Sequence, residues 1–215
     1  MSSRKKPFAI GEYYHVFNRG VDRRDVFMDN EDFERFLRSM REFNNKEPMG
    51  GLHMHEFRDR LIREIGQLDP LVNIICYCLN PNHFHMVFEQ VAERGVEKFM
   101  HRLGTGHTKY FNVRHKRVGS LFQGKFQSVH IDSDEYLLHV SAYVNLNYRV
   151  HRLRSKASKS SWDEYIRGLK DSHKDAVCTK DVILGQFQNP LEYRRYAERN
   201  LPLIQERKDL ARLLF

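Results

Sequence analysis

The sequence lacks any long hydrophobic run. No stretch of its 215 residues approaches the roughly 18 apolar residues that a membrane-spanning helix needs. The first seven residues carry basic side chains without an apolar segment behind them, so a secretory signal is not expected. We therefore expect a cytoplasmic protein that does not contact a membrane.

Cysteine is scarce as well, with Cys76, Cys78 and Cys178 the only three. An odd, low number gives no disulfide framework, and no pair has the spacing of a zinc ribbon. Cys76 and Cys78 lie in an apolar run, where small buried core residues are expected. A reducing cytosol fits this pattern.

Acidic residues are fewer than basic ones, at 28 against 36, which leaves a formal charge of +8. A basic surface favours a polyanionic partner such as nucleic acid, although many other proteins share this balance. Hydrophobic residues make up 40% of the chain and charged residues 30%, which is typical of a soluble globular protein.

The apolar pattern predicts core elements in the order strand, helix, hairpin, helix, strand, helix. This order suits an α+β fold with helices on one face of an antiparallel sheet. We expect the core over residues 1–150, with a polar insertion at about 45–70, and a basic linker and helical extension over 151–215. The expected elements are a strand at 13–18, a helix at 29–44 capped by Asp29 or Asn30, hairpin strands at 71–79 and 83–89, a helix at 96–113, a strand at 120–131, and a helix from Asp132 to about Val150 in which Glu135 resembles part of a capping box.

Two histidines follow the predicted hairpin turn as His83-Phe84-His85. On a strand, residues two apart share one face, so the two imidazoles can form half of a metal site. Surface histidines near a turn are the alternative, since twelve histidines make chance pairs common. His53 and His55 have the same spacing but precede a helical pattern, where such residues do not share a face.

The helix that starts at Asp132 carries one stripe of side chains at helical spacing: Tyr136, Val140, Tyr143 and Asn147. Tyr143 and Asn147 lie one turn apart, so a phenol and an amide oxygen can reach the same point. An ordinary core stripe is the alternative, because a buried tyrosine needs only one hydrogen-bond partner.

Five short blocks resemble, in their order, the HUH single-tyrosine transposases, and most of all the branch called REP-associated tyrosine transposases. They are residues 14–20, 80–85, 119–126, 134–137 and 143–147. The resemblance implies a ferredoxin-like core, with His83 and His85 as metal ligands, Tyr143 as nucleophile and Asn147 as a third ligand. The family usually has proline after the position of Asn147, whereas this chain has Tyr148.

This resemblance implies an enzyme that cleaves and rejoins single-stranded or hairpin-bearing DNA through a 5′-phosphotyrosine, as a monomer or homodimer. Two imidazoles and an amide leave the full charge of the metal for the phosphate, so we expect Mg²⁺ or Mn²⁺. Basic residues near the site are expected to contact DNA, with a solvated charged face as the alternative. They are Lys109, Arg114, Lys116, Arg117, Lys125, Arg152 and Arg154.

Two other functions remain open from the sequence. A protein on the same fold that binds hairpin DNA without catalysis would keep the basic surface but need no metal. A metal-dependent hydrolase using activated water would leave a free 5′-phosphate and no attached protein; its weakness is that the histidine motif itself contains no carboxylate.

Overall fold

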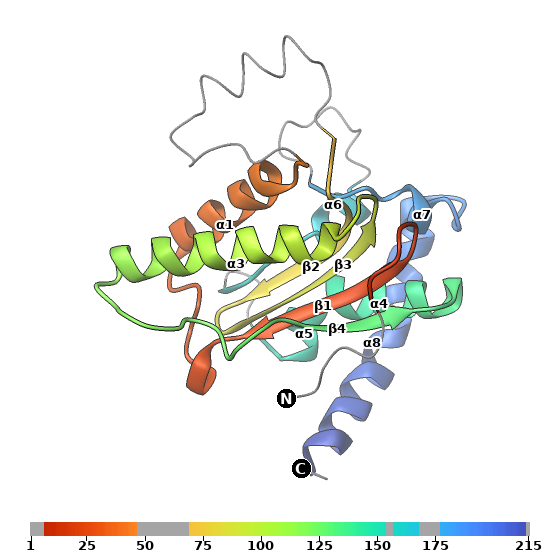
Figure 1. Cartoon of the computed structure of the whole chain (residues 1–215). Coiled ribbons are helices and arrows are strands. Elements are labelled where there is room, and N and C mark those ends of the chain that lie inside the picture. Colours follow the sequence, from red (N-terminus) through yellow and green to blue (C-terminus); the bar gives the residue numbers. More distant parts are fainter. Residues whose placement is uncertain (1–6, 47–68, 154–156, 168–176, 214–215) are drawn as a thin grey trace.

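An antiparallel sheet of five strands forms the centre of this computed structural model (Figure 1), in the spatial order β4-β1-β3-β2-β5. The structure describes residues 7–46, 69–153, 157–167 and 177–213. Most of the expected insertion, including His53 and His55, lies outside these residues, as does Arg154. The strands are β1 (Tyr13–Arg19), β2 (Val72–Asn80), β3 (His83–Gln90), β4 (Gln127–Ile131) and β5 (Lys159–Ser160).

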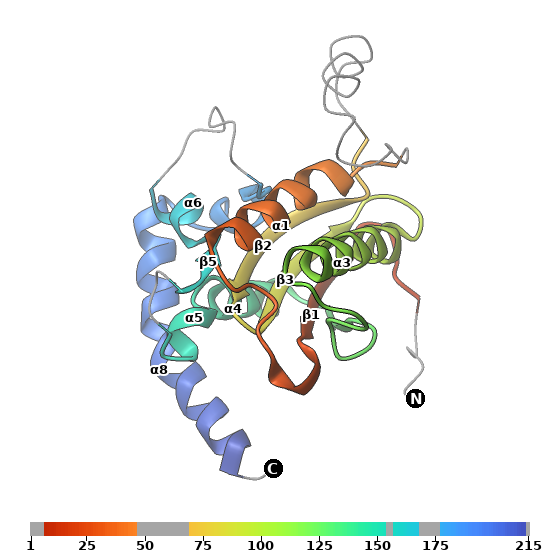
Figure 2. The ribbon, with the colours of Figure 1, turned by 90° about the vertical axis from the view of Figure 1, so that its left-hand side faces the viewer.

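The expected α+β, ferredoxin-like architecture is confirmed. Two helices, α1 (Asn30–Phe43) and α3 (Gly95–Arg114), cover one face of the sheet (Figure 2). The other face is packed against α4 (Asp134–Asn145), which in turn contacts α8 (Pro190–Leu213). The helices therefore flank both faces of the sheet, whereas the sequence pattern predicted helices on one face only; the prediction missed that α4 packs on the face opposite to α1 and α3 (Figure 2). The short helices are η1 (Val21–Arg23), α5 (Asn147–Val150), α6 (Trp162–Ile166) and α7 (Asp181–Leu184).

Alternation along β3 decides which side chains each layer receives. Phe84 packs on Phe36 of α1, and Phe88 packs on Phe99 of α3. Because successive side chains on a strand point to opposite faces, His83 and His85 project to the face that α4 covers. The hydrophobic pattern of the hairpin thus fixes the core and directs the two histidines away from it.

Local sequence explains where α1 begins. Asp29, one of the two predicted caps, caps α1: its carboxylate accepts hydrogen bonds from the backbone N–H groups of Glu31 and Asp32.

Cys76 and Cys78 are fully buried in β2, which confirms their expected place in the core. None of the described helices is long and apolar enough to cross a membrane.

Three boundaries differ from the prediction. The expected strand at 120–131 is shortened to β4, because Gly119 and Gly124 have φ angles of +87° and +82° that turn the chain before it. The helix expected from Asp132 is capped by Ser133, whose hydroxyl accepts from the backbone N–H of Tyr136. That helix ends at Asn145, and the separate short helix α5 begins after Leu146.

The C-terminal part of the chain is joined to α4 by buried hydrogen bonds. Asn145 of α4 donates to the hydroxyl of Tyr193 on α8 over 2.8 Å and accepts from the Ser161 hydroxyl over 2.6 Å. Ser161 also accepts from the backbone N–H of Tyr77 on β2. The segment interpreted as a basic linker contributes β5, which pairs with β2. Sheet, α4 and α8 therefore share one polar network.

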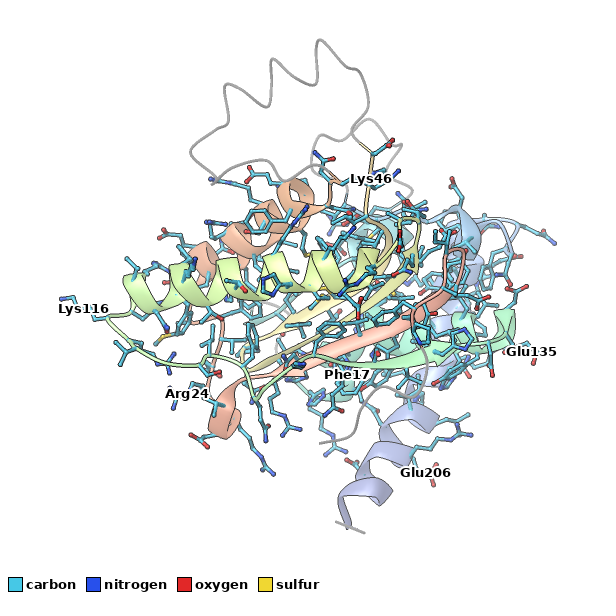
Figure 3. The ribbon with its side chains drawn as sticks, viewed as in Figure 1. Phe17, Arg24, Lys46, Lys116, Glu135 and Glu206 are labelled. Carbon is cyan, nitrogen blue, oxygen red and sulfur yellow. The ribbon has the colours of Figure 1, made fainter. Side chains whose placement is uncertain are left out.

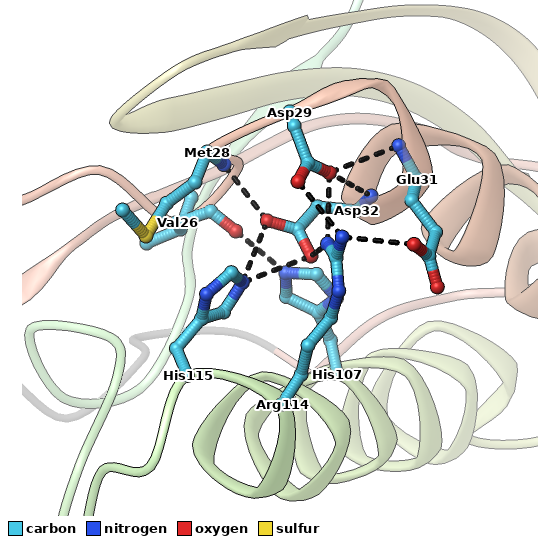
Figure 4. Close-up of polar contacts among 8 residues, drawn as sticks. All are labelled: Val26, Met28, Asp29, Glu31, Asp32, His107, Arg114 and His115. Atoms are coloured by element: carbon cyan, nitrogen blue, oxygen red, sulfur yellow. Dashed lines mark hydrogen bonds and ion pairs between the residues drawn. The ribbon is translucent and has the colours of Figure 1, made fainter.

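An ion-pair network joins α1 to the C-terminal end of α3. The guanidinium of Arg114 contacts the carboxylates of Asp29, Glu31 and Asp32 at 2.7 to 2.8 Å (Figure 4). Beyond Arg114 the helix ends, and Lys116 at its tip is exposed (Figure 3). The Asp32 side chain is fully buried and also accepts from the Met28 backbone and contacts His115. The network holds the two helices of this layer together.

We expect replacement of Asp32 by alanine to lower the free energy of unfolding at pH 7 by about 2–3 kcal/mol. This is somewhat less than the roughly 3–5 kcal/mol lost on breaking a fully buried pair, because Arg114 keeps Asp29 and Glu31. Urea unfolding would measure the change. The matched control is Glu31→Ala, which removes an exposed partner of Arg114 and should cost under about 0.5 kcal/mol. Equal losses in the two variants would contradict this role of Asp32.

The contribution of Asp32 should also depend on pH. Burial alone would raise the pKa of this carboxyl, but hydrogen bonds from the Met28 amide, Arg114 and His115 outweigh it and hold the pKa below its usual value. A depressed folded-state pKa stabilises the protein above the unfolded value of about 4. This stabilisation is lost as the pH falls through the folded-state pKa.

Candidate active site

The two histidines of β3 are each held by a hydrogen bond at Nδ1. His83 Nδ1 lies 2.6 Å from Asn82 Oδ1, and His85 Nδ1 lies 2.9 Å from His15 Nε2. The Asn82 amide is oriented by its Nδ2, which donates to the Arg23 carbonyl, so its oxygen faces His83. His83 therefore carries its hydrogen on Nδ1, and its Nε2 is an acceptor that faces Asn80 and Asn147, the tautomer typical of a metal-ligating histidine.

The side-chain oxygen of Asn147 lies close to His83 Nε2. Asn80 Nδ2 donates to Asn147 Oδ1 over 2.7 Å and lies 2.9 Å from His83 Nε2, while its own oxygen accepts from the Ser158 hydroxyl. Asn147 Oδ1 and His83 Nε2 are then two acceptors only 3.3 Å apart. Two ligands of one ion, bound at about 2.1 Å, are separated by a similar distance. The donor set therefore fits a divalent cation.

His151 completes a cluster that the sequence reasoning missed. One nitrogen from each of His83, His85 and His151 lies within 4.8 Å of the others, a group that can hold a metal ion. His151 follows Asn147 by four residues, so the stripe of Tyr143 and Asn147 extended by one more turn would have found it.

Tyr143 projects from α4 toward the histidines of its own chain. Its ring centroid lies 5.4 Å from that of His85 and 5.8 Å from that of His15. Burial raises the pKa of the Tyr143 phenol above its ordinary value of 10, while the amide of Asn147 acts in the opposite direction. The phenol is therefore protonated at neutral pH and needs activation to act as a nucleophile. Asn147 itself is fully buried, and its Nδ2 has no hydrogen-bond partner.

His15 on β1 is a second site residue that motif reasoning did not single out. It is largely buried, and burial lowers its pKa to about 4, so the ring is neutral at pH 7. Its contact with His85 Nδ1 orients that ring. No spacing rule relates His15 to His85, because the contact depends on the pairing of β1 with β3.

The predicted DNA-contacting residues do not form one group around the histidines. Lys109 and Arg114 lie on α3, which covers the opposite face of the sheet, and Arg114 is already paired with three carboxylates. Figure 3 shows Lys116 at the tip of α3, well away from Phe17 on β1. Arg117 donates to Asn112 and to the Ser120 carbonyl.

Two further predicted cations can be placed. Lys125 is exposed just after Gly124, in the loop before β4. Arg152 directly follows His151, and its side chain is 76% exposed although paired with Asp209. Arg152 is thus next in sequence to a histidine of the cluster.

The fold and the cluster define an α+β protein with a candidate metal centre beside a half-buried tyrosine. Residues 10–147 match the family model described as "Transposase IS200 like". Since this match spans more than half of the 215 residues, the chain belongs to the IS200-like transposase family. No curated protein matches the sequence.

A solved structure supports the fold. It is described as "Structure of the REP associates tyrosine transposase bound to a REP hairpin" and superposes with a TM-score of 0.51 at 14% identity. The match covers 84% of this chain and 98% of that chain. The resemblance to tyrosine transposases found in the sequence is therefore confirmed for family and fold.

Proposed function

We propose that this transposase cleaves and rejoins single-stranded DNA, with Tyr143 as nucleophile beside a divalent metal held by His83, His85 and Asn147. The observation that supports this best is the approach of a helix-borne phenol to the His-x-His pair of the same chain. Because the similar REP-associated transposase is bound to a hairpin, we infer that the substrate carries a hairpin.

In the proposed reaction the Tyr143 oxygen attacks the scissile phosphorus and loses its proton to solvent. The bond from phosphorus to the 3′ oxygen breaks, and that oxygen leaves as a 3′-hydroxyl. The DNA stays attached through a 5′-phosphotyrosine. Since this link keeps the bond energy of a phosphodiester, a second 3′-hydroxyl can attack it and restore the tyrosine. Strand transfer therefore needs no external energy source.

The residues around the proposed phosphate position have separate roles in the reaction. A bound divalent metal would supply charge that polarises the phosphate and stabilises the developing negative charge. Asn82 and His15 orient the two imidazoles. Asn147 lies one turn beyond Tyr143, with its unpartnered Nδ2 able to donate to the phenolate that forms.

The function is tested by incubating the purified protein with Mn²⁺ and an end-labelled single strand that contains a hairpin. We expect a labelled protein–DNA adduct that survives denaturant, and a released strand with a 3′-hydroxyl. A free 5′-phosphate without adduct would instead identify a hydrolase using activated water. Tight metal-independent binding without cleavage would identify a hairpin-binding protein that lacks catalysis.

We infer that the DNA strand crosses strands β1 and β4 on the face of the sheet that carries His83 and His85. Residues opposite one another in an antiparallel pair point to the same side, so Phe17 and Arg19 share the face of His85 and His83. α4 packs on β2 and β3, and Val129 of β4 remains 41% exposed on this face. Phe17 stacks 5.5 Å from His85 and offers a ring to a base, while exposed Arg19 offers a charge to a phosphate.

Replacing Arg19 by alanine is therefore expected to weaken binding of the hairpin-bearing strand about tenfold and to reduce the slope of log affinity against log salt by about one. Fluorescence anisotropy at several salt concentrations measures both. Lys109→Ala is the matched control, since it removes one exposed charge from α3 on the opposite face, and should change affinity less than about twofold. The reverse result would place the DNA along α3.

A further inference from the structure

We propose that His151 is a third imidazole ligand of the metal site, a role that neither the histidine motif nor the Tyr143 stripe assigned to it. The proposal rests on the proposed function only in requiring that the site bind a divalent cation. With His151 the site offers three imidazole nitrogens together with the Asn147 oxygen. This set discriminates between the two cations that the sequence left open.

Proximity is the first argument. The rings of His83 and His151 lie 4.4 Å apart between centroids, and one nitrogen from each of the three histidines lies within 4.8 Å of the others. An ion that binds two nitrogens at about 2.1 Å can join atoms up to about 4.2 Å apart. The widest pair therefore has to close by at least about half an ångström if its nitrogens lie on opposite sides of the ion, and by more than about one ångström if they are neighbouring ligands.

Helix geometry is the second argument. Tyr143, Asn147 and His151 are spaced four residues apart. The backbone hydrogen bonds from Leu146 to Ala142 and from His151 to Asn147 keep the helical i to i−4 pattern on both sides of the break. Nucleophile, amide and imidazole therefore lie on one side of the α4–α5 segment, toward β3. The contacts of Tyr143 with His85, and of Asn147 and His151 with His83, place all three side chains beside β3.

Ligand chemistry gives the consequence. Imidazole nitrogens suit later transition metals, whereas Mg²⁺ prefers oxygen ligands. A pair of imidazoles with an amide oxygen leaves the choice between Mg²⁺ and Mn²⁺ open. A third imidazole favours Mn²⁺ over Mg²⁺. We expect affinity to follow the order Co²⁺, Mn²⁺, Mg²⁺ from tightest to weakest. His151 is thus expected to strengthen the preference of the site for Mn²⁺ and Co²⁺ over Mg²⁺.

The test measures metal binding by the full chain without DNA. Calorimetric titration with Mn²⁺ and Co²⁺ compares the unmodified protein with His151→Ala. The control is His101→Ala, which removes an exposed histidine from α3. We expect His151→Ala to weaken Mn²⁺ and Co²⁺ binding by at least about 10- to 100-fold, and His101→Ala to leave it unchanged. Affinity within about twofold in both variants would overturn the proposal.

A second readout needs no substitution and decides the matter if His151→Ala fails to fold. Pulsed electron paramagnetic resonance of the Mn²⁺-loaded protein counts the coordinated imidazole nitrogens, and we expect three. A count of two would overturn the role of His151. Three nitrogens without a protein–DNA adduct would leave this proposal standing and remove the proposed function. A protein–DNA adduct together with only two coordinated nitrogens would support the proposed function and overturn the role of His151.

Discussion

Tyr143→Phe is expected to abolish the covalent protein–DNA adduct, with a loss of at least about 10³-fold in the rate of its formation. Phenylalanine keeps the ring that contacts His85 and His15 but removes the oxygen that would bond to phosphorus. Hairpin binding should therefore be unchanged. A denaturing gel measures the adduct, and anisotropy measures the binding.

Tyr136 supplies the matched control for this substitution. It lies on the same helix as Tyr143, but its side chain is 36% exposed, so Tyr136→Phe should react at the normal rate. An adduct that survives in Tyr143→Phe and disappears in Tyr136→Phe would show that the nucleophile has been assigned to the wrong residue. Loss of binding in Tyr143→Phe would show instead that the hydroxyl serves the fold or the DNA contact.

Replacing His83 and His85 together by alanine is expected to reduce adduct formation by about 10³-fold or more, because the charge that stabilises the transition state would no longer be held at the phosphate. Chelation of the metal in the unmodified protein should give the same loss. A single His85→Ala variant keeps His83 Nε2 beside Asn147 Oδ1. It should therefore recover part of its rate at high Mn²⁺ concentration.

The control is the pair His53→Ala and His55→Ala, which removes a motif of identical spacing from outside the described residues. We expect this double variant to react at the normal rate. Adduct formation that persists under chelation would exclude a metal-dependent mechanism. A defect in the His53 and His55 variant equal to that of His83 and His85 would contradict the choice of motif.

Local patterns predicted the parts of the site that lie on single elements. Alternation in the hairpin directed Phe84 to the core and the histidines to the opposite face, and helical spacing placed Tyr143 and Asn147 on one stripe. Both rules depend only on the geometry of one strand or one helix. Extended by four more residues, the same spacing includes His151, which lies in the histidine cluster.

Contacts between distant elements could not be predicted in the same way. The bond between His15 and His85 depends on the register of β1 against β3, and hydrophobic periodicity does not give that register. Arg114 was expected to meet phosphate, but the cap of α1 and its neighbours place three carboxylates around it. A count of charges in the sequence treats Arg114 as available to bind phosphate, whereas in the folded protein it is already paired with carboxylates.

The family match ends at residue 147, yet the helix that carries Tyr143 is held from beyond that limit. Separating α8 from α4 would leave the buried Asn145 Nδ2 without the Tyr193 hydroxyl that it donates to, at a cost of about 1–3 kcal/mol. A chain shortened before Pro190 would keep every residue matched by the family model and still lose the helix that packs against α4. We therefore expect a chain that ends at residue 147 to be less stable than the full chain.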